Sequence, residues 1–79
     1  MRILFFGRIA DIAGPSREID TQGFSTVRDV TEALCKEPAL ADLLKAPTTV
    51  TVLDHTVVKD HAELKGAAEL AYLPPVSGG

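Results

Sequence analysis

The sequence has few of the residues that usually carry chemistry. It contains one cysteine, two histidines and no tryptophan. A single cysteine, Cys35, excludes an internal disulfide and is typical of a chain that works in a reducing cytoplasm. His55 and His61 have no second ligand at a metal-binding spacing, so no metal site is predicted. The sequence also lacks the phosphate-binding loop of nucleotide-binding enzymes and the Gly-x-Ser-x-Gly motif of hydrolases.

Charge and hydropathy exclude two further classes of protein. The net charge is −3, and acidic and basic residues are interleaved without a basic run. Nucleic-acid binding therefore lacks its electrostatic signature. No apolar stretch approaches the ~18 residues of a membrane span, and the first residues do not form a signal peptide. We expect a cytoplasmic protein that binds neither nucleic acid nor membrane.

Hydrophobic periodicity predicts one small α+β domain. The chain has 79 residues, of which 46 % are hydrophobic, enough for one modest core. Helix 27–37 has the clearest start, because Thr26 can cap it and Asp29 follows three residues later. Pro38 is expected to end that helix. The predicted strands are 2–7, 17–22, 48–53, 56–58 and 69–74, the other helices are 8–14 and 39–45, and segment 61–70 is ambiguous.

The order of these elements favours a β-grasp fold, in which one main helix crosses a mixed sheet. A ferredoxin-like arrangement remains an alternative. Strand 2–7 is apolar on both faces, so we expect it to be central or covered on its second face. Phe6 and Leu73 would belong to that second face. The pattern leaves open whether a partner protein or the chain's own loops cover it.

The end of the chain, Pro-Pro-Val-Ser-Gly-Gly, is its most specific feature. Gly78 and Gly79 have no side chains, so the backbone could enter a narrow site with the Gly79 carboxylate leading. A carboxylate resists nucleophiles and must first be activated in a site that excludes water. Pro74 and Pro75 favour an extended path, and residues 74–79 reach about 20 Å. We therefore predict a domain at 1–73 and an extended, flexible tail at 74–79.

Three segments carry a resemblance to a known family: "ILFFGRIADIAG" (3–14), "FSTVRDVTEAL" (24–34) and "LAYLPPVSGG" (70–79). The chain resembles the small subunit of molybdopterin synthase, the sulfur carrier of molybdenum-cofactor biosynthesis. The last segment is the most specific, because that family ends in Pro-Pro-Val, a small hydroxyl residue and Gly-Gly. Segments 54–58 and 65–70 depart from the family pattern, and we interpret them as turns.

The resemblance implies a β-grasp fold and a definite cycle. An ATP-using activating enzyme adenylates Gly79, and sulfur transfer then forms a thiocarboxylate. The tail, through Pro74, Pro75, Val76 and Ser77, enters the large synthase subunit, which converts cyclic pyranopterin monophosphate to molybdopterin. On this reading the small subunit is non-catalytic alone, binds no cofactor permanently and works in a hetero-oligomer.

Three other interpretations remain. A sulfur carrier for thiamin or another sulfur-containing product would use the same chemistry. A ubiquitin-like modifier would keep its tail attached to a lysine through an isopeptide bond. A plain interaction module would not use its tail at all.

Overall fold

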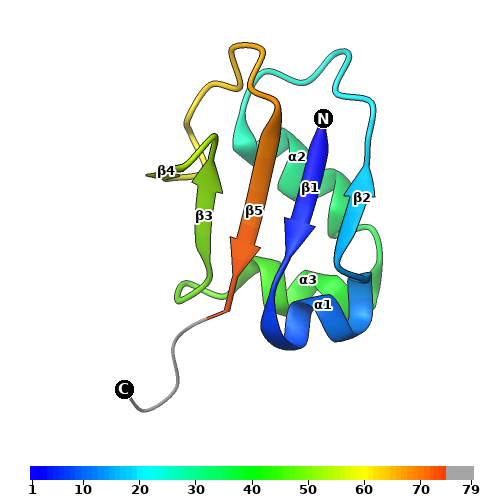
Figure 1. Ribbon diagram of the computed structural model, residues 1–79. Helices are drawn as coiled ribbons and strands as arrows, with labels where there is room; N and C mark the ends of the chain where they lie inside the picture. Colours follow the sequence, from blue (N-terminus) through cyan, green and yellow to red (C-terminus); the bar gives the residue numbers. More distant parts are fainter. Residues whose placement is uncertain (75–79) are drawn as a thin grey trace.

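Figure 1 shows the computed structural model, which describes residues 1–74. Within that range, five strands form one sheet and three helices accompany it. No helix of the described part is long and apolar enough to cross a membrane. The elements are β1 (Arg2–Phe5), α1 (Gly7–Ala13), β2 (Ser16–Glu18), α2 (Val27–Leu34), α3 (Pro38–Lys45), β3 (Val50–Leu53), β4 (Thr56–Val58) and β5 (Glu69–Leu73).

The strands lie in the order β2-β1-β5-β3-β4. β1 and β5, which come first and last in the chain, are parallel neighbours inside the sheet, and the other pairs are antiparallel. Strand β1 is therefore internal, as its two apolar faces predict. A mixed sheet crossed by a helix is the β-grasp architecture, so the predicted fold class is confirmed (Figure 1).

Helix α2 begins where the sequence predicts. The Thr26 hydroxyl accepts from the N–H of Asp29, and the Asp29 carboxylate accepts from the N–H of Thr26 at 3.0 Å. This reciprocal pair is a capping box, which satisfies N–H groups that the first turn of a helix leaves free. Backbone hydrogen bonds from Ser25 and Thr26 also lower the pKa of Asp29.

The predicted end of this helix is wrong. We expected it to continue to residue 37 and to stop at Pro38, but α2 ends at Leu34 and Pro38 opens α3. Proline suits the first position of a helix because the N–H that it lacks has no partner there. Here Pro38 begins a helix, although a proline at this place could equally have ended one.

The predicted strand 17–22 is also wrong in extent, because β2 spans only Ser16–Glu18. The Asp20 carboxylate accepts from the N–H of Gln22 at 2.9 Å. Such a local bond favours a turn over a sheet ladder. The ladder of hydrogen bonds between β1 and β2 therefore stops soon after Glu18, although the N–H of Ile19 still donates to the carbonyl of Met1.

The ambiguous segment 61–70 contains no helix before β5 begins at Glu69. Lys65 and Gly66 both have positive φ, 46° and 72°, which bends the chain sharply. The side chain of Leu64 is buried in the core. The segment is therefore a looped connection, and the interpretation of 65–70 as containing a turn holds for Lys65 and Gly66.

The core lies between the sheet and the helices. Ile3, Phe5, Leu70 and Tyr72, from the two central strands, are buried together with residues of all three helices. The rings of Phe5 and Tyr72 stack with centroids 6.0 Å apart, and the Tyr72 hydroxyl lies 2.6 Å from that of Thr31. Burial raises the pKa of Tyr72 to about 12. The phenol is therefore neutral at physiological pH and joins the sheet to α2.

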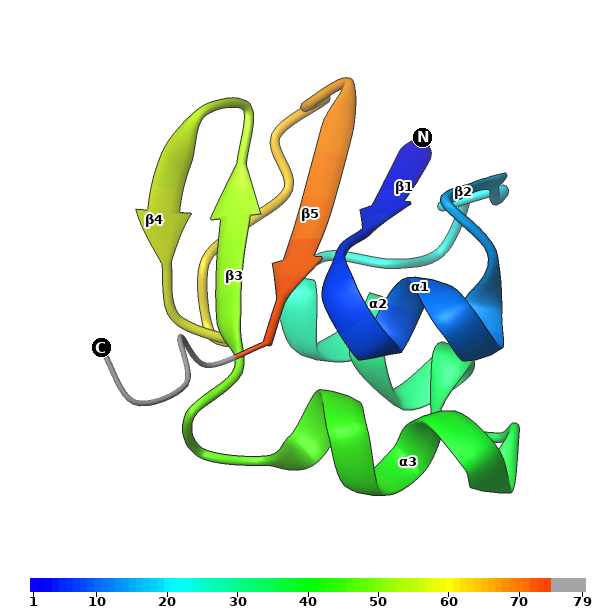
Figure 2. The same ribbon diagram turned by 60° about the horizontal axis from the view of Figure 1, so that its bottom comes forward.

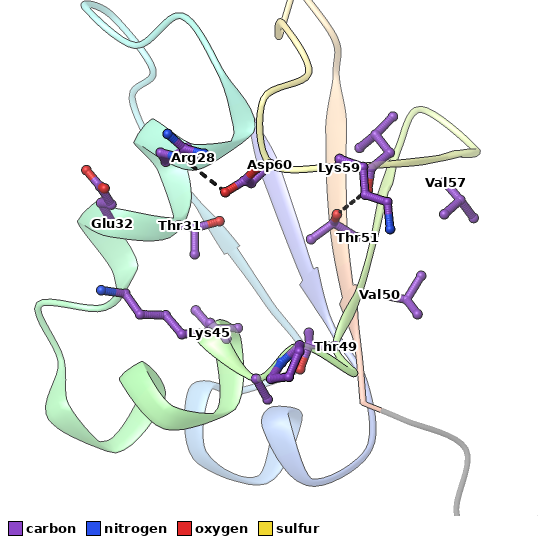
Figure 3. A pocket seen from close by; sticks show the side chains of 14 residues that line it. Arg28, Thr31, Glu32, Lys45, Thr49, Val50, Thr51, Val57, Lys59 and Asp60 are labelled. Atoms are coloured by element: carbon purple, nitrogen blue, oxygen red, sulfur yellow. Dashed lines mark hydrogen bonds and ion pairs between the residues drawn. The ribbon is translucent and has the colours of Figure 1, made fainter.

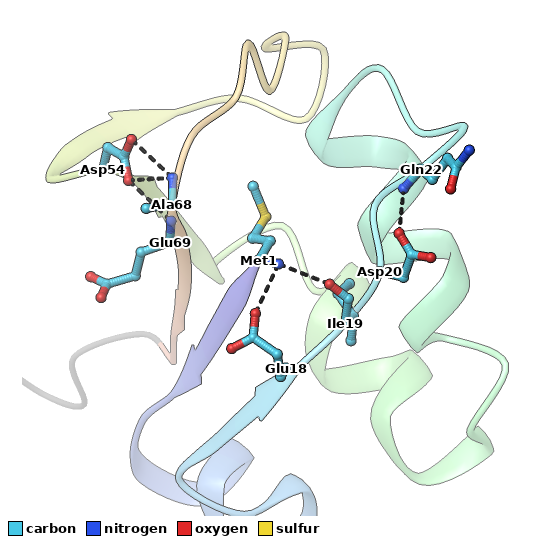
Figure 4. A network of polar contacts seen from close by, with 8 residues as sticks. All are labelled: Met1, Glu18, Ile19, Asp20, Gln22, Asp54, Ala68 and Glu69. Atoms are coloured by element: carbon cyan, nitrogen blue, oxygen red, sulfur yellow. Dashed lines mark hydrogen bonds and ion pairs between the residues drawn. The ribbon is translucent and has the colours of Figure 1, made fainter.

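A two-residue turn at Asp54 and His55 joins β3 to β4. Both residues have positive φ, 43° and 73°, as tight hairpins require. The Asp54 carboxylate accepts from the N–H groups of Ala68 at 3.1 Å and Glu69 at 3.0 Å (Figure 4). The hairpin turn is thus tied to the start of β5.

Replacing Asp54 with glycine is expected to lower the free energy of unfolding by about 1 kcal/mol. The two N–H groups lose their acceptor, while glycine still accepts the positive φ. Chemical denaturation measures the change. The control, His55→Gly, keeps the carboxylate and should be at least as stable as the parent protein. An Asp54→Gly variant of parental stability would show that these bonds contribute nothing.

Candidate functional site

The residues predicted to carry the chemistry, Gly78 and Gly79, lie outside the described residues, as do Pro75, Val76 and Ser77. Their roles stay predictions, and so does the division of the chain into a domain at 1–73 and a tail at 74–79. The description ends at Pro74, directly after β5. The structure therefore shows where the predicted tail begins and what surrounds that point.

The end of β5 is held on both sides. Leu73 pairs with Val50 of β3, and the N–H of Phe6, just beyond β1, donates to the carbonyl of Tyr72 at 3.2 Å. Pro74 follows and is partly buried. The hollow beside it has a volume of about 150 Å³ and is lined by Arg8, Ile9, Leu43, Ala46, Thr48, Thr49 and Pro74. The chain thus leaves the sheet at a well-defined point, where α1 meets the loop before β3.

One face of the sheet is turned away from the helices. Side chains alternate between faces along a strand, and cross-strand partners share a face. Ile3 and Tyr72 are buried in the core, which lies on the side of the sheet that the helices cover (Figure 2). Their neighbours along each strand therefore point to the other side. We name this surface the open face. The name covers the apolar residues on this side, which are Leu4, Phe6, Val50, Val52, Val57, Ala71 and Leu73. The polar residues Arg2, Ser16, Glu18 and Glu69 share this side by the same register and are not part of the open face.

The open face is apolar and reaches the point of chain exit. Phe6 is 46 % exposed and Val57 is 69 % exposed, while Leu73 is partly buried. Cross-strand pairs join the surface from β1 through β5 and β3 to β4. A contiguous exposed apolar surface usually marks an interaction site. Phe6 and Leu73 both lie on it, and their predicted role in binding a partner stays a prediction.

A groove between α2, the end of α3 and the β3–β4 hairpin has a volume of about 430 Å³ and shares Val50 and Val57 with the open face (Figure 3). Much of its polar lining already makes bonds within the fold. Arg28 pairs with Asp60 at 3.0 Å, and the hydroxyl of Thr51 donates to the carbonyl of Val58 at 2.8 Å. Few polar groups therefore converge on a small molecule, and the groove is a weaker candidate than the open face.

The side chains that could act as nucleophiles or ligands are not gathered into a site. Cys35 is partly buried, and burial raises the pKa of its thiol, so it stays protonated at neutral pH. His55 and His61 are exposed, as expected of ordinary surface residues. Among residues 1–74, no group of three or more His, Cys, Asp or Glu side chains could hold a metal ion. Within this range, the apolar surface beside the chain exit is the strongest functional feature.

Sequence reasoning missed the part of the open face that β3 and β4 contribute. It identified Phe6 and Leu73 from the two central strands, but not Val50, Val52 or Val57. The alternation in "VTVL" does place Val50 and Val52 on one side of β3. Only the pairing of β3 with β5 shows that this side is the same as that of Leu73.

Comparison with known proteins bears on the family and the fold of this chain. Residues 3–79 match the ThiS family. The chain is similar to a protein in a solved structure described as the crystal structure of SAMP1 from Haloferax volcanii, with 27 % sequence identity and a TM-score of 0.81. That similarity covers 99 % of this chain and 97 % of the other. No curated protein matches the chain.

Proposed function

The chain belongs to the ThiS family of ubiquitin-like sulfur carriers, which work with partner enzymes, and from this premise we propose that it carries sulfur for molybdenum-cofactor biosynthesis. In this role it is the small subunit of molybdopterin synthase. Its working group is the carboxylate of Gly79. The activity resides in the cytoplasm and involves two partners, an ATP-dependent activating enzyme and the large synthase subunit.

The proposed cycle uses the terminus and none of the protein's side chains as reacting groups. A carboxylate oxygen of Gly79 attacks the α-phosphorus of ATP, and pyrophosphate leaves. A donor that supplies sulfur at the oxidation level of sulfide then attacks the acyl carbon, AMP leaves, and the product is a thiocarboxylate, a soft nucleophile that is ionised at neutral pH. In the large subunit this sulfur bonds to a carbon of cyclic pyranopterin monophosphate. Water then cleaves the bond between the sulfur and the Gly79 carbonyl carbon, so the carrier returns as a free carboxylate. Gly78 contributes by keeping the terminus narrow enough to enter both partners.

The observation that carries the proposal is the position of the chain exit beside the open face. Leu73 belongs to the open face, and Pro74 follows it directly. A partner that covers this face therefore stands next to the start of the tail. In the proposed complex, Phe6 and Leu73 hold the body, while Pro74, Pro75, Val76 and Ser77 line the path of the tail.

Free energies explain why the body must dock as well as the tail. Ordering the four residues after the prolines costs about 4–8 kcal/mol. Burying an apolar patch of roughly 300–600 Å² would give about 8–15 kcal/mol before the losses of rigid-body association. The open face can thus offset the cost of ordering a tail that has almost no side chains of its own.

The sulfur-containing product can be tested directly. Thiocarboxylated protein is offered separately to the large subunit of molybdopterin synthase with cyclic pyranopterin monophosphate and to a thiazole-forming enzyme of thiamin synthesis. We expect single-turnover sulfur transfer only in the first reaction, with the carrier returning as a free carboxylate. Transfer only in the second reaction would assign the protein to thiamin. A chain that stays attached to lysine residues would make it a modifier.

A further inference from the structure

Gly7, the first residue of α1, is in close contact with the residue that begins the predicted tail. Its φ is +55°, a conformation that residues with a side chain rarely adopt. A Cβ atom placed on Gly7 would lie 2.6 Å from Cγ of Pro74 and 3.4 Å from Cδ. The proline ring therefore occupies the space that a side chain at residue 7 would need.

This contact distinguishes Gly7 from other glycines with positive φ. Gly14, Gly23 and Gly66 have φ values of 89°, 89° and 72°, and a Cβ atom on any of them would meet nothing within 4 Å. Those three positions require glycine for the backbone conformation alone. Gly7 is constrained twice, by its conformation and by the ring of Pro74.

Three contacts define the path of the chain over residues 72–74. The Tyr72 carbonyl accepts from the N–H of Phe6, Leu73 pairs with Val50, and the ring of Pro74 lies against Gly7. The proline ring also locks its own φ. We propose that Gly7 is a positioning residue, which sets the direction of the tail by leaving room for Pro74 against the first turn of α1.

The inference rests on the proposed function, in which one partner holds the open face and takes up the tail at the same time. The tail is short, about 20 Å when extended. A tail that leaves the sheet in another direction must use part of this length to turn back toward the partner's site. The local concentration of the terminus at the partner's site then falls, and so does the fraction of encounters with reactive geometry.

The test compares a graded series, Gly7→Ala and Gly7→Val, in the full chain. We expect kcat/KM for adenylation by the activating enzyme to fall about threefold for alanine and about tenfold or more for valine. Affinity for that enzyme without ATP should change by less than about twofold, because the open face is intact. Pyrophosphate release gives the rates, and calorimetry gives the affinity.

Two variants separate the contact with Pro74 from backbone strain. Gly14→Val introduces a larger backbone strain, because φ 89° and ψ 169° at Gly14 suit glycine almost alone, but no atom lies within 4 Å of its Cβ. Its kcat/KM should therefore match that of the parent. Pro74→Ala removes the Cγ atom and with it the clash, so adding Gly7→Ala to a Pro74→Ala background should cost no further rate. Gly7 variants that are adenylated as well as Gly14→Val would overturn the proposal, and so would a double variant that is slower than Pro74→Ala alone.

A second readout does not depend on enzyme activity. A spin label on Ser77→Cys, in a Cys35→Ala background, broadens NMR signals of amides near the tail. Gly7→Val should change which amides are broadened, while Gly14→Val should not. The same broadening pattern in both variants would contradict the role of Gly7 even if the protein carried no sulfur. If the parent chain is never adenylated, the proposed function fails, and the NMR result still decides whether Gly7 directs the tail.

Discussion

Deletion of Gly79 is expected to abolish sulfur transfer and leave the fold intact. The shortened chain ends at Gly78, so its carboxylate lies about 3.3 Å short of the position that the activating site requires. Misplacement of this size removes the near-attack geometry on which proximity catalysis depends. We expect the rate of thiocarboxylate formation to fall by at least about 100-fold. The free energy of unfolding should change by less than about 0.5 kcal/mol, because terminal residues make few contacts.

Intact-mass measurement of the treated protein and chemical denaturation provide the two readouts. Lys36→Ala is a suitable control, because Lys36 is exposed, follows α2 and leaves the terminus unchanged. This variant should accept sulfur at the parental rate. If the protein without Gly79 formed a thiocarboxylate as fast as the parent, the terminus could not be the carrier group.

Phe6→Asp is expected to weaken binding to the large subunit by about 2 kcal/mol, close to thirtyfold in Kd. The aspartate would place a charge inside an apolar interface, where no partner for it is expected. Leu73→Asp should have a similar effect on binding. It should also lower stability somewhat, because Leu73 is partly buried whereas Phe6 is 46 % exposed.

Ile12→Asp is the matched control for this prediction. Ile12 is 48 % exposed, almost the same as Phe6, but it lies on α1 and not on the sheet. The same chemical change there should leave Kd within about twofold of the parent. Calorimetric titration with the large subunit measures all three variants. Equal losses for Ile12→Asp and Phe6→Asp would show that the open face is not the binding surface.

The sequence allowed the fold to be predicted where local chemistry has one outcome. Thr26 and Asp29 form a capping box in any helix that begins there, and the apolar residues of strand 2–7 require an internal position. The boundary at Pro38 failed because proline is compatible with both the end of one helix and the start of the next. Segment 61–70 stayed ambiguous because Leu64 is buried without belonging to a periodic element.

The candidate site also has one part that the sequence reveals and another that only the folded structure reveals. The Gly-Gly terminus and the prolines before it can be recognised directly in the sequence, since the role proposed for them depends on the backbone alone. The open face cannot, because it depends on strand pairing: Val50 lies opposite Leu73 only in the observed register. The contact between Gly7 and Pro74 joins residues from opposite ends of the chain, so no local pattern indicates it.

The central claim is that the Gly79 carboxylate accepts sulfur, and one mass measurement tests it. The protein is incubated with the activating enzyme, ATP and a sulfur donor, and its intact mass is compared with that of a sample without ATP. We expect an ATP-dependent gain equal to the replacement of one oxygen by sulfur, located by fragmentation at Gly79. An unchanged mass under conditions that convert a known carrier, or a sulfur adduct on Cys35, would contradict the account.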